Sequence, residues 1–399
     1  MGLLDKFFPR PVKPENYSKL VIEEFRRNNV IASASASDPF ELTLGQESKV
    51  FLNNAYSQYC SAGDAERAAK VTFFVSAQLE ERITLTNENL DQLLPVVRSN
   101  AFYSLLDLTR RAEGNTGQSS SAFETFGPGI AVGLVVDSEK AMTLVQSSDL
   151  DALGLTFGEA LNIALKNLET GFEHTFIEHA DGLYIGDWSD GYDSSRILLP
   201  SVWSDLKLKG IPLIHIPSRD KFFIFGASDP FAMELALRLG EEEHFGAYPL
   251  SCDMFAQHDG KWKVGVPAAP ESKAIQDRMV RRRLALDYAQ QKELLERIYE
   301  RDHIDLFVAS YSLYNDPPDQ FSASVWSRGI PTLLPQTDQV ILLVDPDKKI
   351  TIRVSWEALR KVCIQLMPRV RGLYPNRSQV VNFPTDVQID QLRTQAIPE

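Results

Sequence analysis

The alternation of apolar and polar residues predicts several short strands that are joined by turns at Gly, Pro and Asp. Residues 129–137 and 141–146 form two such runs around the turn 137–140, and this pattern is typical of a β-hairpin. A second hairpin is expected around the Asp181-Gly182 turn. Residues 210–216 form an apolar run that predicts a buried strand. Antiparallel hairpins are therefore expected to build much of the central part of the chain.

Helical spacing alternates with these strands. Thr156 and Glu159 make a capping box before an amphipathic helix, and Gly171 stands where a helix end favours positive φ. The longest periodic stretch runs from Glu271 to about Asp302 and predicts one helix of roughly 45 Å. Such a helix is long enough to connect two bodies.

These patterns together predict an α+β protein with mixed α/β lobes, antiparallel hairpins and a smaller C-terminal α/β domain. The linker-like stretch 113–127, rich in Gly, Ser and Thr, divides two lobes. The expected units share this order along the chain: an N-terminal α+β lobe at 1–112, a central α+β lobe at 128–268, a long linking helix at 271–302, and a C-terminal α/β domain at 303–399 that ends in a polar tail after Pro368. Deletion of 271–399 is expected to leave a soluble folded core.

Part of the central sequence occurs again downstream. The order Ser201-Val202-Trp203-Ser204, Gly210-Ile211-Pro212, Pro217, Asp220 is matched by Ser324-Val325-Trp326-Ser327, Gly329-Ile330-Pro331, Pro335, Asp338. We interpret this echo as an internal repeat of a helix–strand–hairpin–helix unit. Chance similarity of common turn residues is the alternative.

Composition favours a globular protein in a reducing compartment. Hydrophobic residues make up 44% of the chain, and no apolar run reaches the roughly 18 residues that a membrane span needs. Its three cysteines lie far apart and form no CxxC pair, so we expect a cytoplasmic location, no disulfide framework and no zinc site. The first turn, with Leu3, Leu4, Phe7 and Phe8, allows a weak peripheral membrane contact, but docking on the protein itself is favoured.

Charge is distributed unevenly. Residues 271–399 hold 18 Lys+Arg and 17 Asp+Glu, whereas the first 270 residues hold 23 and 37, a net of −14. An acidic body of this kind repels nucleic acid. The basic cluster of Arg278 and Arg281–Arg283 is expected to be a solvated helix face, with pairing to an acidic surface as the next choice. No nucleic-acid partner is predicted.

The densest group of polar residues lies between Asp187 and Asp220. Asp190 and Asp193 suit turn and helix-cap roles, and their spacing does not match a calcium loop. The remaining candidate site is a polar pocket in which Asp193 and Arg196 face Arg219 and Asp220. Arg–carboxylate pairs there would hold the helix on the hairpin, whereas a ligand site would need one Arg free to bind an anion.

Other polar residues carry weaker signals. His174 and His179 fall on opposite faces of a strand, which excludes a shared metal ion, and His215 is expected to be a hydrogen-bonded core residue. No GxSxG, HExxH or P-loop motif is present. We therefore predict no metal and no cofactor, and the sequence leaves open whether the protein is an enzyme.

Four segments carry a family resemblance: LPVVRSNAFY, LTFGEALNIALKNL, DGYDSSRILLP and IPSRD. In this order and spacing, over about residues 15–268, the chain resembles the YtpQ-like bacterial family, catalogued as domain of unknown function 1444. The resemblance implies a cytoplasmic bacterial protein of mixed α and β structure. That family has no established activity, so no catalytic residue is implied, and residues 271–399 lie outside the resemblance.

Two functions follow from these patterns. The favoured one is a non-enzymatic protein-interaction or regulatory protein that binds a protein partner through 271–399. The alternative is an enzyme or a small anionic-ligand-binding module that uses Asp193, Arg196, Arg219 and Asp220. The sequence does not indicate the oligomeric state.

Overall fold

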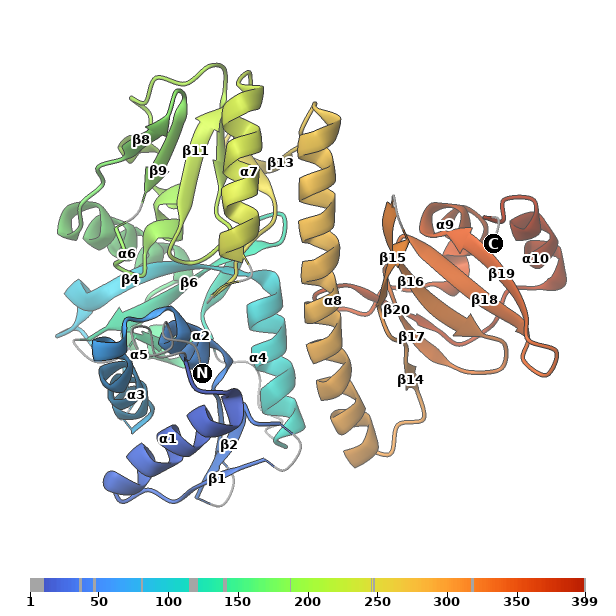
Figure 1. The fold of residues 1–399 in the computed structure, drawn as a ribbon, viewed down its shortest axis with the longest axis horizontal. Coiled ribbons are helices and arrows are strands. Elements are labelled where there is room, and N and C mark those ends of the chain that lie inside the picture. Colours follow the sequence, from blue (N-terminus) through green and yellow to red (C-terminus); the bar gives the residue numbers. More distant parts are fainter. Residues whose placement is uncertain are drawn as a thin grey trace, which may run out of the picture.

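The computed structural model describes residues 11–35, 38–45, 48–79, 82–114, 121–138, 142–186, 188–244, 246, 248–316 and 319–397 (Figure 1). Predictions for the N-terminal turn around Leu3–Phe8, for Asp187 and for residues 115–120 and 139–141 lie outside these residues. Helices combine with several separate, mainly antiparallel sheets, which confirms the predicted α+β class.

The first unit has a core of its own. Its elements are α1 (Pro14–Arg27), β1 (Ala32–Ala34), β2 (Glu41–Leu44), β3 (Ser48–Phe51), α2 (Asn53–Ser61) and α3 (Asp64–Leu79). The three strands pair as β1-β2-β3. Tyr17, Val21 and Phe25, at helical spacing on α1, are fully buried against this sheet unit and the other two helices.

A four-stranded sheet follows, with the order β4-β6-β5 and with β7 also paired to β6. The strands and helices of this part of the chain are η2 (Leu90–Gln92), β4 (Leu93–Ser99), α4 (Asn100–Ala112), β5 (Phe123–Gly127), β6 (Ile130–Asp137), β7 (Met142–Leu144), α5 (Ser147–Leu153) and α6 (Phe157–Gly171). β4 pairs with β6, so this sheet joins residues on both sides of the linker-like stretch at 113–127. The capping box of Thr156 and Glu159 at the start of α6 is confirmed. Gly171 is still helical and does not have positive φ, so that prediction is wrong.

A six-stranded antiparallel sheet has the order β13-β12-β10-β11-β9-β8. Its elements are β8 (Ile177–Ala180), β9 (Leu183–Gly186), η3 (Asp193–Leu198), η4 (Pro200–Val202), β10 (Pro212–His215), β11 (Phe222–Gly226), α7 (Pro230–His244), β12 (Met254–His258) and β13 (Lys261–Gly265). His215 is buried and hydrogen-bonded through Nδ1 to the Asp253 carbonyl at 3.0 Å, as predicted.

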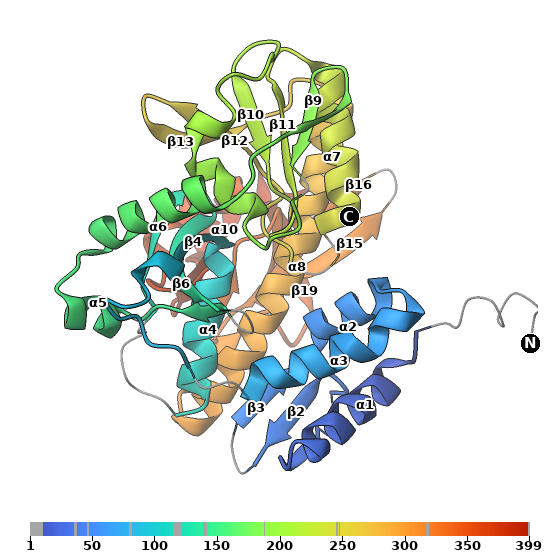
Figure 2. The same ribbon diagram turned by 90° about the vertical axis from the view of Figure 1, so that its left-hand side faces the viewer.

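The long helix α8 (Pro270–Arg301) is confirmed, and it stands between the two bodies of the molecule (Figure 1). Near its start, Ile275 and Met279 belong to the core under the six-stranded sheet. Near its end, Leu294 and Ile298 pack with Leu108 of α4, and the view in Figure 2 shows α4 beside α8. The helix is therefore part of two cores rather than a free connector.

The C-terminal domain has two small sheets, β14-β17-β20 and β15-β16-β18-β19. Its elements are β14 (Phe307–Val308), β15 (Ser312–Asp316), β16 (Asp319–Ser327), β17 (Thr332–Pro335), β18 (Gln339–Asp345), β19 (Ile350–Ser355), α9 (Trp356–Cys363), η5 (Ile364–Leu366), β20 (Arg377–Val380) and α10 (Asp386–Arg393). The segment predicted to be a polar tail thus contains β20 and α10. Ile389 and Leu392 of α10 are buried in the domain core, a signal too short to stand out in the sequence.

The two segments of the sequence echo adopt different structures. Residues 201–204 lie in and after the 3₁₀ helix η4, whereas Ser324-Val325-Trp326-Ser327 belong to strand β16. Gly210 and Gly329 share a positive φ before a strand. The following strands differ again, because β10 pairs with β11 whereas β17 and β18 belong to separate sheets. The two segments therefore share similar turns and not a common arrangement of helices and strands.

Candidate functional site

Arg196 is fully buried in η3, and every nitrogen of its guanidinium group has a partner. Nη1 and Nη2 donate to the carboxylate of Asp190 at 3.1 and 2.6 Å, and Nη2 also donates to the Glu173 carbonyl at 2.7 Å. Nε donates to Nδ1 of His174 at 3.1 Å, and the group lies 3.9 Å from the Trp188 ring centre. Arg196 therefore holds η3 on the preceding segment and has no nitrogen left for a ligand.

Asp193 also faces inward. Its Oδ1 accepts hydrogen bonds from the main-chain N–H groups of Trp188 and Ser189 at 2.9 and 3.4 Å, so it closes the preceding turn. Tyr192, not Asp193, occupies the N-cap position of η3, and the helix-cap prediction is wrong. Burial, and next the charge of Asp190, raise the pKa of Asp193 to about 6.

Arg219 pairs with its own neighbour. Its Nε lies 2.8 Å from Oδ1 of Asp220, and its guanidinium group stacks 3.8 Å from the Tyr248 ring centre. The main-chain N–H of Ser194 donates to the Arg219 carbonyl at 3.1 Å. The backbone thus brings the two predicted segments together, but Arg196 pairs with Asp190 and Arg219 pairs with Asp220, so the four side chains do not form one mutual cluster.

A different arginine lacks a bonded carboxylate among the residues that the structure describes. Arg98, half-buried on β4, donates to the Val97 carbonyl at 2.8 Å and contacts Sδ of Met142 at 3.8 Å. Burial, and next the positive charge of Arg219, lower the pKa of Arg98 to about 10. Sequence reasoning missed Arg98, although a charged residue within the apolar run LLPVVRS was an available signal.

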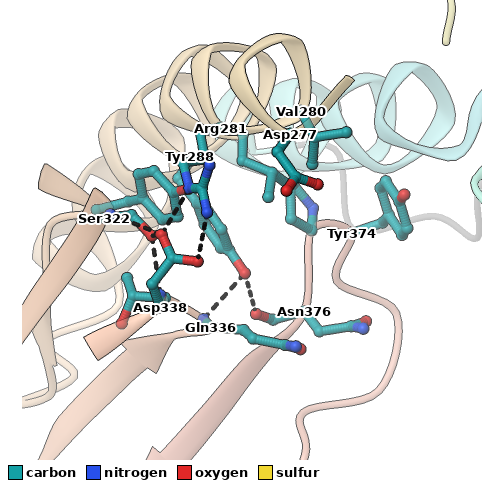
Figure 3. Close-up of a pocket in the computed structure, with 13 residues that line it drawn as sticks. Asp277, Val280, Arg281, Tyr288, Ser322, Gln336, Asp338, Tyr374 and Asn376 are labelled. Atoms are coloured by element: carbon teal, nitrogen blue, oxygen red, sulfur yellow. Dashed lines mark hydrogen bonds and ion pairs between the residues drawn. The ribbon is translucent and has the colours of Figure 1, made fainter. Parts of the chain in front are cut away.

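A pocket of about 320 Å³ lies where α8 meets the C-terminal domain (Figure 3). One stripe of α8 forms one wall, and four segments of the C-terminal domain form the others. The lining residues are Asp277, Val280, Arg281, Leu284, Tyr288, Tyr311, Ser322, Gln336, Thr337, Asp338, Tyr374, Pro375 and Asn376. Its volume is at the small end of the range for ligand pockets.

The carboxylate of Asp338 connects the two sides of this pocket. It accepts a hydrogen bond from Nε of Arg281 at 2.9 Å, and from the main-chain N–H and the hydroxyl of Ser322 at 2.7 and 2.8 Å (Figure 3). Burial alone would raise the pKa of Asp338, but these donors outweigh it and hold the pKa below its usual value.

Tyr288 makes a second connection. Its hydroxyl donates to the Asn376 carbonyl at 2.6 Å and accepts from the main-chain N–H of Gln336 at 3.1 Å, and its ring stacks on Tyr311 at 5.1 Å (Figure 3). The thirteen lining residues include no His, Cys or Lys. Arg281, Asp338 and Ser322 bond to one another and the Tyr288 hydroxyl bonds to the main chain, although the buried Oδ1 of Asn376 has no hydrogen-bond partner among the described residues. The pocket wall thus works mainly as a junction that fixes the domain on α8.

The basic cluster on α8 contributes to the same junction. Arg278 makes two bonds to Glu241 of α7, at 2.8 and 2.7 Å, while Arg281 reaches Asp338 across the pocket. Arg283 binds Asp287 one turn further along at 2.9 Å. The cluster is therefore only partly solvated: Arg278 and Arg282 are 42% and 45% exposed, while Arg278 and Arg281 pair with acidic residues distant in sequence, which is the alternative that the sequence offered.

The buried side chains of Cys252 and His244 lie as close together as a catalytic thiol and its base, with Sγ 3.2 Å from Nε2. Burial raises the pKa of the thiol above its usual range and lowers the pKa of His244 to about 3. Both groups are then neutral near pH 7, and a neutral buried thiol is not a nucleophile. Among the described residues, no three His, Cys, Asp or Glu side chains are placed to hold a metal ion.

Comparisons with protein-family models, with curated proteins and with solved structures gave no match. In the described part of the chain, no helix has the length and apolar character needed to cross a membrane.

Proposed function

We propose that this chain is a non-enzymatic protein-interaction protein whose C-terminal domain binds its partner. A partly exposed sheet face carries this proposal; it is mainly apolar and also holds Arg353, whose guanidinium lies 5.8 Å from the Phe321 ring centre. Tyr314 and Phe321 pair across β15 and β16 with their rings stacked at 5.2 Å, and Val325 pairs with Ile341 across β16 and β18. Tyr314 is 43% exposed and Val325 is 45% exposed.

Alternation along the strands explains why this face is distinct from the core. Val340, Leu342 and Val354 point to the other face, where they pack against α9 and α10. Figure 1 shows these two helices together at one end of the domain. The face of Tyr314, Phe321, Val325, Ile341 and Leu343, which we call the open sheet face, is left with apolar groups that are only partly buried. Such groups in one place favour a protein contact.

Charge indicates what kind of partner fits. Residues 303–399 hold 10 Lys+Arg and 10 Asp+Glu, whereas residues 1–302 carry the whole net charge of −13. A strongly basic partner would be attracted to the acidic body, whereas a neutral or acidic protein meets least repulsion at the C-terminal domain. We propose that the partner is a different protein that presents apolar side chains on a neutral or acidic surface.

Photo-crosslinking in cells tests this proposal. A photoreactive residue at position 325 is expected to give one defined adduct, whereas the same residue at 387, on α10 and 70% exposed in the native Val387, is not. The adduct partner is then purified and its binding is measured directly. An adduct of twice the chain mass would mean self-association, and an equal adduct at both positions would mean non-specific contact; either result contradicts the proposal.

Location and family remain part of this proposal. The free cysteines Cys60, Cys252 and Cys363, two of them buried, support a cytoplasmic location. The order of the four sequence segments supports membership of the YtpQ-like bacterial family, and this rests on those segments alone.

A further inference from the structure

A hollow of about 320 Å³ lies on the six-stranded sheet, on the face against which α7 packs. Leu213 of β10 and Ala256 of β12 line it from the sheet, and Met233 lines it from α7. The helix packs over β9, β10 and β11, whereas β13 is the outermost strand on the other side of β12 (Figure 2). The hollow is therefore the part of this apolar face that extends past α7 toward β12 and β13.

The hollow is apolar at its bottom and at its rim. Gly265 of β13 has no Cβ, and one placed there would lie 2.8 Å from Cδ2 of Leu213, so Leu213 packs against the main chain and closes the bottom. At the rim, Ile211 is 48% exposed and Val266 is 72% exposed. Apolar side chains around a concave site are typical of places where small molecules bind. These groups offer contacts to the apolar part of a ligand.

One end of the hollow is basic. Lys263 lines it and stands opposite Ala256 in the β12–β13 pair, so its side chain extends from the face on which Ala256 lies. His258 also lines the hollow, two residues after Ala256 on β12, and Lys261 stands opposite His258 on that same face. Among the described residues, neither Asp259 of the adjoining turn nor any other Asp or Glu lines the hollow, although the first 270 residues carry a net charge of −14. A locally basic place in an acidic body attracts small anions.

We infer that this hollow binds a small amphipathic carboxylate. Its short apolar chain lies on Leu213, Ala256 and Met233, and its carboxylate lies at Lys263. Removal of the chain from water supplies most of the affinity, because an exposed ion pair contributes little alone. The volume is at the small end of the range for ligand pockets, which limits the ligand to a short chain. The charge of Lys263 selects an anion over a cation of the same shape.

Calorimetric titration of the full chain with octanoate, octylammonium and acetate tests the inference at constant ionic strength. Octanoate is expected to bind saturably at one site per chain. Octylammonium, with the same chain and the opposite charge, is expected to bind at least about tenfold more weakly, because it meets Lys263 and Lys261. Acetate is expected to show no saturable binding, since it lacks the apolar chain.

Two substitutions at exposed positions locate the site with little effect on the fold. Lys263→Glu is expected to weaken octanoate binding about tenfold and to strengthen octylammonium binding, whereas a general loss of structure would weaken both. Val266→Asp puts a carboxylate at the rim and is expected to weaken octanoate binding about tenfold. The matched controls are Lys361→Glu on α9 and Val387→Asp on α10, at side chains 68% and 70% exposed, and both are expected to bind octanoate like the wild type.

The inference is overturned if octanoate does not bind saturably, or if octylammonium or acetate binds as tightly as octanoate. It is also overturned if Val266→Asp binds octanoate as well as Val387→Asp does, or if Lys263→Glu keeps the wild-type preference for octanoate over octylammonium. The inference does not depend on the open sheet face.

Discussion

Arg196 and Asp190 form a two-nitrogen contact, at 3.1 and 2.6 Å, in which the arginine is fully buried and the carboxylate side chain is 21% exposed. In the sequence, Arg196 is one of the four candidate ligand-site residues, with Asp193, Arg219 and Asp220. The geometry of the Arg196–Asp190 pair instead satisfies the arginine from within the chain, so its effect falls on folding rather than on binding.

Replacing Arg196 is therefore expected to destabilise the protein strongly. Arg196→Ala leaves Asp190 without its bonded cation and removes the contact with the Trp188 ring. Breaking such a pair typically costs about 3–5 kcal/mol. The free energy of unfolding in urea measures this loss. Arg238→Gln, at an arginine on α7 that is 61% exposed and paired with Glu234, serves as the exposed comparison. A loss below about 1 kcal/mol for Arg196→Ala would be the size expected of a surface pair and would contradict a structural role for Arg196.

Replacing Gly240 of α7 by Ala is expected to destabilise the protein, the opposite of the usual effect of Gly→Ala in a helix. An added Cβ at Gly240 would lie 2.2 Å from Nε2 of fully buried His215. Gly→Ala usually stabilises a helix by about 1 kcal/mol, but this overlap is expected to destabilise by roughly 1–3 kcal/mol. Gly158→Ala on α6, where nothing lies within 4 Å, is the matched control and is expected to stabilise. Equal thermal shifts for the two variants would show that His215 does not fill that space.

Burial raises the pKa of Asp253 to about 6, and this predicts a pH dependence. The folded protein keeps this proton between about pH 4 and pH 6 while the unfolded chain releases it, so the contribution of Asp253 to stability falls as the pH rises through that window. Burial lowers the pKa of His215 to about 4, so the contribution of His215 to stability rises with pH over the same window. The effect of Asp253 is therefore measured as the difference in stability between the wild type and a variant that lacks its carboxylate.

The variant Asp253→Asn is expected to gain stability relative to the wild type as the pH rises from 4 to 7, by roughly 2 kcal/mol. Urea unfolding at both pH values gives the difference. If the two proteins keep a constant difference across this range, Asp253 does not carry a raised pKa.

Removal of 271–399 is now expected to prevent folding, contrary to the expectation from the sequence. Ile275 and Met279 belong to the core that also contains Phe223, Met233 and Leu237. A chain that ends at 270 lacks these groups and exposes an apolar surface. Near-UV circular dichroism and urea unfolding measure the outcome, and a cooperative transition of the shortened chain would refute the assignment of α8 to this core.

Local signals carried the sequence predictions that the structure confirms. The capping box at Thr156 and the long helix need only neighbouring residues, because caps and amphipathic faces are set within a few turns. The apolar neighbours of His215 along its strand predict its place in the core.

The helix-end predictions at Gly171 and Asp193 failed on local signals, whereas the prediction of a solvated face for the α8 arginines failed in part because it depended on distant partners. Arg278 and Arg281 of α8 contact Glu241 and Asp338, which are 37 and 57 positions away in the chain. Nothing in the local pattern fixes such pairs, because they follow from how sheets and helices pack. The same reason explains why β4 and β6 join across the linker-like stretch.

The central claim is that the open sheet face binds a partner protein, and the direct measurement is the dissociation constant of the crosslinked partner for Val325→Glu compared with Val387→Glu. Val325 lies on the open sheet face and Val387 on α10, and both are exposed, so neither change is expected to alter folding beyond about 0.5 kcal/mol. The account predicts a dissociation constant at least about tenfold higher for Val325→Glu and unchanged for Val387→Glu. Equal dissociation constants for the two variants would contradict it.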